Sequence, residues 1–130
     1  MAAFGKASLE RLATCDERLQ RVAHEAIKVM DHSILVGHRN EADQNKALAE
    51  GKSTKAWPNS RHNTLPSMAL DFAPYPIEWD DARRFALLAG IYIGIGRGMG
   101  IHIKSGFDWD EDGNIKEHSL IDGPHVEIVE

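Results

Sequence analysis

The sequence has a single cysteine, no long apolar run and no excess of basic residues, and each absence excludes a class of protein. Cys15 cannot form an internal disulfide, so a disulfide scaffold is excluded. No stretch approaches the roughly 18 apolar residues needed to cross a bilayer, so we expect no membrane insertion. Charges interrupt the first twenty residues too early for a secretory signal, so we expect a protein kept in a cytoplasm until something else releases it.

The charge balance argues against a nucleic-acid partner. The net charge is −5, and the 15 lysines and arginines are dispersed along the chain, whereas binding to phosphates requires clustered cations. A chain of 130 residues with 42% hydrophobic residues fits one domain, residues 1–130, with a core of its own. We expect a monomer. The seven histidines are the compositional oddity, because histidine is the commonest metal ligand.

Hydrophobic periodicity predicts helices in the first part of the chain. Apolar residues recur at helical spacing over residues 8–30 and predict two consecutive helices, the second with Asp16 as its N-cap. The short β-branched segment 33–39 predicts a buried strand whose end delivers His38 and Arg39 to a sheet edge. A further helix follows and stops at Gly51.

The second part of the chain combines a long loop with strands and one helix. Residues 52–66 are polar and irregular, and a connection of this length is typical of a functional loop. Residues 68–74 predict a strand, and residues 77–100 predict a long central helix although glycines weaken its end. The remaining residues are β-like on either side of a turn at DEDGN. The order of elements predicts an α+β domain with a small antiparallel sheet packed with helices.

Three residues form a candidate metal site. His62 lies in the polar loop, Asp71 in the following strand and His125 in the final strand. Two imidazoles and a carboxylate are ligands of catalytic zinc, with the fourth position open for water. Asp122 precedes His125 by three residues across a Gly-Pro turn, where a carboxylate could act as a general base. Taken singly, a loop histidine is more often solvated and a strand aspartate more often a hydrogen-bond acceptor, so only the three residues together indicate a metal site.

Four segments together resemble a known family. SRHNTLPSMALDFAP and DGPH resemble the Ser-x-His, Ala-x-Asp and acid-x-x-His pattern of the zinc peptidases of the D-alanyl-D-alanine carboxypeptidase (VanY-like, M15) type. GHRNEADQNKALAEGKS is similar to the family's Gly-x-Arg segment with its following Gln, and SGFDWDEDG to its Gly-Gly-Asp-Trp stretch. Carboxypeptidase members commonly have Glu and Trp where this chain has Asp122 and Pro124, which favours the phage L-alanyl-D-glutamate endolysin branch. Many members separate the His and the Asp by seven positions, whereas here the separation is nine.

The resemblance implies a fold, an activity and a set of site residues. The fold would be the zinc D,D-peptidase-like (Hedgehog/DD-peptidase) fold. The chain would be an endolysin that cleaves a peptidoglycan stem peptide at the L-alanyl-D-glutamate bond, released from the host cytoplasm through a holin-made lesion. The alternatives are a D,D- or L,D-carboxypeptidase with the same metal site, and a metal-stabilised wall-binding domain without catalysis. The implied roles are one Zn²⁺ bound by His62, Asp71 and His125, a general base in Asp122, substrate binding or carbonyl polarisation by Arg39, and substrate contacts from Ser60 and Gln44.

The other histidines and Cys15 have simpler interpretations. His24, His32, His102 and His118 are expected to be structural or solvent-facing, with His38 as the reserve ligand. A reactive cysteine needs an electropositive setting, whereas acids follow Cys15. A role as nucleophile is therefore not expected.

An acidic run near the C-terminus imitates the start of a calcium-binding loop. It comprises Asp108, Asp110, Asp112 and Gly113, but its twelfth position is Ser119, where an EF-hand requires a bidentate Glu. A complete EF-hand is excluded. We expect a tight acidic turn, with Ca²⁺ at most an accessory ion.

Overall fold

The computed structural model describes residues 2–111 and 123–130. Four α-helices, one short 3-10 helix and four strands alternate along these residues. Their bounds are α1 Lys6–Leu12, α2 Glu17–Val29, β1 His32–Val36, α3 Glu41–Ala49, η1 Arg61–Asn63, β2 Ala69–Pro74, α4 Ala82–Gly98, β3 Ile103–Ser105 and β4 His125–Ile128. Among these residues, no helix is long and apolar enough to cross a membrane.

The strands form one antiparallel sheet in the order β1-β2-β4-β3. This arrangement confirms the predicted α+β class with a small antiparallel sheet. β2 and β4 are the central strands, and their register places Asp71 directly opposite His125. Residues paired in this way have Cβ atoms only about 4.5–5.5 Å apart, so the sheet itself brings two of the predicted ligands together.

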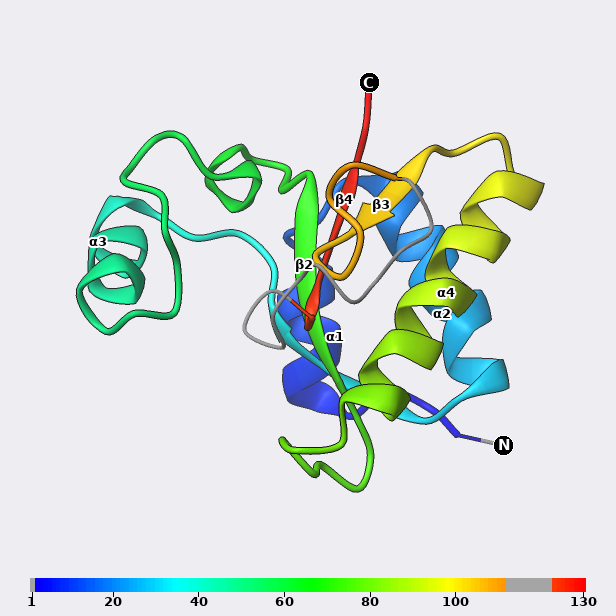
Figure 1. Ribbon diagram of the computed structural model, residues 1–130. Helices are drawn as coiled ribbons and strands as arrows, with labels where there is room; N and C mark the ends of the chain where they lie inside the picture. Colours follow the sequence, from blue (N-terminus) through cyan, green and yellow to red (C-terminus); the bar gives the residue numbers. More distant parts are fainter. Residues whose placement is uncertain (1, 112–122) are drawn as a thin grey trace.

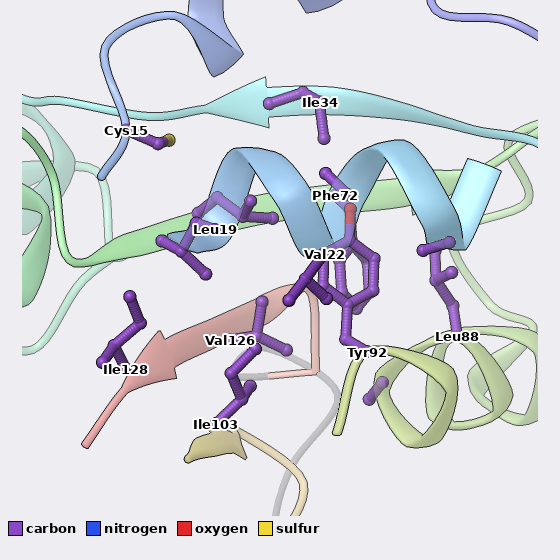
Figure 2. Packing of buried hydrophobic residues seen from close by; sticks show 14 of the residues in the cluster. Cys15, Leu19, Val22, Ile34, Phe72, Leu88, Tyr92, Ile103, Val126 and Ile128 are labelled. Atoms are coloured by element: carbon purple, nitrogen blue, oxygen red, sulfur yellow. The ribbon is translucent and has the colours of Figure 1, made fainter. Parts of the chain in front are cut away.

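The hydrophobic core lies between one face of the sheet and helices α2 and α4 (Figure 1). Leu19 and Val22 of α2 and Tyr92 of α4 approach Phe72 and Val126 of the sheet, and all five are fully buried (Figure 2). Because side chains alternate across a strand, Asp71 and His125 lie on the opposite face. That face is turned toward α3 and the loop after it, which stand apart from the helix layer in Figure 1.

The helix boundaries follow local capping. Asp16 begins α2 as predicted, and its carboxylate accepts a hydrogen bond from the Arg18 backbone amide at 2.9 Å. Gly51, with φ of +74°, follows α3 in the left-handed conformation that glycine adopts without strain. The central helix begins at Ala82, five residues later than expected, since Asp81 occupies its N-cap position and its amide closes a turn onto Glu78.

The strands near the C-terminus are shorter than their composition predicts. β3 ends at Ser105 because the chain turns there, with the Asp108 amide donating to the Ser105 carbonyl at 3.0 Å. The amide of Gly106, the residue after Ser105, still donates to the His125 carbonyl at 2.9 Å. The turn therefore stays attached to β4 beside His125.

Candidate active site

His62, Asp71 and His125 converge on one point. The distances are 3.1 Å from His62 Nε2 to Asp71 Oδ1, 3.2 Å from His62 Nε2 to His125 Nδ1, and 3.3 Å from His125 Nδ1 to Asp71 Oδ1. These three atoms, which we call the ligand triangle, satisfy the spacing of a shared metal site. Residues 63 positions apart in the chain thus present their donor atoms to the same place.

The ligand triangle fits a tetrahedral zinc ion. In a regular tetrahedron with bonds of about 2.0 Å, the donor atoms are about 3.3 Å apart. The observed sides of 3.1 to 3.3 Å are close to that edge. Two neutral imidazoles and one carboxylate are also the donor set of zinc sites that keep an open fourth position.

The nine-residue separation of His62 and Asp71 is accommodated by η1. Ser60 and Asn63 form a capping box: the Ser60 hydroxyl accepts from the His62 amide at 3.2 Å, and the Asn63 side chain accepts from the Ser60 amide at 3.0 Å. The chain then returns, and the Met68 amide donates to the Arg61 carbonyl at 3.2 Å. His62 is therefore held beside the first residues of β2 despite the length of the loop between them.

Each histidine is oriented by a bond to its other ring nitrogen. His62 Nδ1 lies 2.7 Å from the Gly37 carbonyl oxygen, and His125 Nε2 lies 2.8 Å from Glu127 Oε1. Both partners accept hydrogen bonds, so these nitrogens carry protons, and the lone pairs available to a metal are on His62 Nε2 and His125 Nδ1. These are the two nitrogens of the ligand triangle.

The pKa values of Asp71 and His125 are shifted by the groups around them. Burial alone would raise the pKa of Asp71, but the charge of His62 and hydrogen bonds from His125 and His62 hold it well below its usual range. Burial would lower the pKa of His125, but its bonds to Asp71 and Glu127 raise that pKa to about 9. A cation bound among these three atoms would compete with a proton for the same nitrogen.

Arg39 lies against the ligand triangle. Its Nη2 atom is 3.3 Å from Asp71 Oδ2, and its backbone amide donates to the His62 carbonyl at 2.8 Å. The side chain is 11% exposed and lines the pocket at the triangle. A largely buried guanidinium at this position can hold a substrate carbonyl or carboxylate.

Gln44, expected from the sequence to contact substrate, bonds to several parts of the site. It is fully buried and is not among the residues that line the pocket. Its Oε1 accepts from Asn63 Nδ2 at 3.0 Å and from Arg39 Nη1 at 3.4 Å, while its Nε2 donates to the Lys55 carbonyl at 2.7 Å. Gln44 thus ties Arg39, η1 and the loop after α3 together, whereas Ser60 lines the pocket.

Three residues near the triangle were not predicted as site residues. Trp109 packs beside His125 with ring centroids 5.1 Å apart, and Lys104 lies over the Trp109 ring at 5.6 Å. Glu127 holds His125 and is paired with Arg61 at 3.6 Å. Strand alternation places Glu127 on the cleft face, and Trp109 belongs to the SGFDW segment, so both had a signal in the sequence.

The remaining candidates lie away from the triangle or outside the described residues. His38 does not join the metal-binding group. His32 is buried and bonds to the Tyr92 hydroxyl at 2.7 Å, as expected of a structural histidine. Burial raises the pKa of the Cys15 thiol to about 12, which disfavours a thiolate nucleophile. Five residues of the sequence predictions lie outside the described residues: Asp112, Gly113, His118, Ser119 and Asp122.

Comparisons with known proteins agree with this geometry. The family model of the phage L-alanyl-D-glutamate peptidase matches residues 1–129. The L-alanyl-D-glutamate peptidase of Escherichia phage T5 is 35% identical over 134 residues, covering 97% of each chain. The crystal structure of the Serratia marcescens L-Ala D-Glu endopeptidase ChiX superposes with a TM-score of 0.75 at 26% identity, covering 98% of this chain and 90% of that one. With a match over nearly its whole length, this chain belongs to the phage L-alanyl-D-glutamate peptidase family.

Proposed function

We infer that this protein is a zinc-dependent peptidoglycan endopeptidase that hydrolyses the bond between L-alanine and D-glutamate of the stem peptide. The observation that carries the proposal is the ligand triangle, whose three donor atoms have tetrahedral spacing and adjoin a pocket lined by Arg39 and Ser60. Membership of the family supports the choice of bond. A wall-degrading enzyme of this kind serves host cell lysis.

His62, Asp71 and His125 would hold the ion. When bound, zinc supplies Lewis-acid chemistry, because it lowers the pKa of water and polarises a carbonyl group. Gly37 and Glu127 keep the two imidazoles in the required tautomers through the bonds at 2.7 and 2.8 Å. Their role is to prevent either ring from rotating out of the triangle.

The acid-base work is assigned to Asp122, three residues before His125 in the sequence. In the hydrolysis one water adds across the amide, giving the carboxylate of L-alanine and the amine of D-glutamate. The Asp122 carboxylate would take a proton from the attacking water and return it to the departing nitrogen. Arg39 would orient the scissile carbonyl or a neighbouring carboxylate, and Ser60 would contact the substrate at the pocket wall.

The protein would act as a monomer on the wall after holin-dependent release from the host cytoplasm. Ca²⁺ would be at most an accessory, since the acidic run from Asp108 to Asp112 lacks the closing Glu of an EF-hand. Removing Ca²⁺ while keeping zinc should change hydrolysis modestly. An absolute requirement for micromolar Ca²⁺ would overturn this part of the proposal.

Mass spectrometry of the fragments released from purified sacculi tests the bond. The proposal predicts new amino-terminal D-glutamate on the peptide and L-alanine left on the glycan. Released terminal D-alanine would instead favour the carboxypeptidase alternative. A zinc-loaded protein that binds sacculi and releases no fragment would favour the wall-binding alternative.

A further inference from the structure

An apolar groove adjoins the ligand triangle on the side of β1. Its volume is about 630 Å³, within the usual range for ligand sites. Leu35, Val36 and Trp79 supply apolar surface. Four of its lining residues, Arg39, Lys52, Asp71 and Pro124, also line the pocket above the triangle. The groove is therefore an extension of the candidate active site.

Trp79 of the groove is exposed although its ring packs against a core residue. It lies in the connection between β2 and α4, and it is 55% exposed. Its ring stacks on Phe85 at a centroid distance of 5.7 Å and an interplanar angle of 27°. Phe85 is buried in the core, so the indole is held in place while much of its surface faces solvent. An exposed aromatic ring fixed in this way is typical of a binding surface.

The two sides of the ligand triangle differ in chemistry. The groove carries Trp79, Leu35 and Val36 beside its charged residues, whereas the rest of the pocket has no such apolar set among its described residues and carries polar and charged residues, including Ser53, Lys55 and Arg61. The substrate of the proposed function has the same asymmetry. L-alanine is joined through a lactyl group to N-acetylmuramic acid, a sugar whose ring carries C–H faces. D-glutamate begins a peptide rich in carboxylates, which suits polar and basic residues such as Ser53 and Lys55 better than the indole of Trp79.

Chain length places the sugar next to the scissile bond. One alanine separates that bond from the lactyl group, and an extended residue spans at most about 3.6 Å. The lactyl group adds a similar length, so the sugar lies within roughly 7 Å of the reacting carbonyl. A groove that shares residues with the active-site pocket is within this reach.

We propose that this groove binds the N-acetylmuramic acid residue of the glycan, with Trp79 stacked against the sugar ring. This inference rests on the proposed function, because it takes the muramyl side of an L-alanyl-D-glutamate bond as the occupant. It adds a glycan subsite and a specificity residue outside the metal centre. The enzyme then distinguishes stem peptides that carry the sugar from those that do not.

The test compares two substrates and two variants. The substrates are an N-acetylmuramyl stem peptide and the same peptide with an acetyl group in place of the muramyl group. Trp79→Ala should raise KM for the muramyl substrate by about 3–10-fold, the range expected for one aromatic contact, and leave the acetylated substrate within about twofold. Leu87→Ala, which removes another exposed apolar side chain, should change neither. Equal effects of Trp79→Ala on both substrates, or no effect, would overturn the proposal.

A titration of the unmodified protein keeps the test independent of folding and of catalysis. N-acetylmuramic acid alone should shift the NMR signals of the Trp79 indole and the Leu35 and Val36 amides. Shifts confined to Lys55 and Trp109, or none at millimolar sugar, would place the sugar elsewhere and refute the groove. Failure of the unmodified enzyme to cleave either peptide would count against the proposed function, whereas the titration would still decide the groove.

Discussion

Substitution of Gly37 tests how the fold positions His62. A Cβ atom at this residue would lie 2.3 Å from Thr14 Oγ1 and 2.4 Å from the Arg11 carbonyl oxygen, where ordinary contact begins at 3.4 Å. Gly37→Ala therefore forces a displacement of about 1 Å between the end of β1 and the end of α1. Overpacking of this kind costs about 1–3 kcal/mol of unfolding free energy.

The same substitution should weaken zinc binding, because the Gly37 carbonyl oxygen accepts the bond from His62 Nδ1 at 2.7 Å. Loss of such an orienting bond typically lowers metal affinity by about 10–100-fold. Urea unfolding of the metal-free protein measures the first effect, and competition with a zinc chelator measures the second. Gly90→Ala is the control: a Cβ there meets nothing within 4 Å, and in a helix this change should stabilise by about 0.5–1 kcal/mol. A Gly37→Ala protein with unchanged stability and zinc affinity would show that Gly37 neither needs its close packing nor positions His62.

Three further predictions concern protons and the candidate metal site. Glu127→Gln keeps an acceptor for His125 but removes the negative charge, so zinc affinity should fall about tenfold. Glu130→Gln, at an exposed residue, is the control and should not change zinc affinity. Equal affinities of the Glu127→Gln and unmodified proteins in a chelator titration would exclude the role of Glu127. Burial lowers the pKa of His32 in the folded protein. Below the unfolded pKa of about 6.5, the unfolded chain therefore binds a proton that the native protein does not bind, and stability is lost as pH falls. The stability advantage of the unmodified protein over His32→Gln, from urea midpoints, should therefore shrink between pH 7.5 and 5, and an advantage that grows would contradict this sign. Asp122→Asn should retain zinc and lose about 10²–10⁴-fold in hydrolysis rate, and near-normal hydrolysis would remove Asp122 from the mechanism.

Alternation, ligand chemistry and the family resemblance predicted the fold class and the three residues that converge as a candidate metal site. Apolar Val126 and Ile128 are buried while His125 faces the pocket, as a period of two requires. The three donor atoms meet because Asp71 and His125 are paired across strands. Sequence could not give that register, since it depends on which strands become neighbours in space.

Side chains that act through others were harder to predict. The sequence predicts a substrate contact for Gln44, and in the structure its buried amide bonds to Arg39 and to the Lys55 carbonyl. Local pattern cannot separate these roles, because both require a polar residue near the site. The groove beside Trp79 was also missed: its walls come from β1, the segment after α3 and the connection before α4, which are distant in the chain.

Zinc content and hydrolysis can be compared in matched variants of the three donor residues. We expect about one zinc per chain in the unmodified protein. His62→Ala, Asp71→Ala and His125→Ala should each lose both zinc and sacculus hydrolysis, since each removes one corner of the ligand triangle. His24→Ala, on the exposed side of α2, is the matched control and should retain both. Full zinc retention with normal hydrolysis in all three triangle variants would contradict the account.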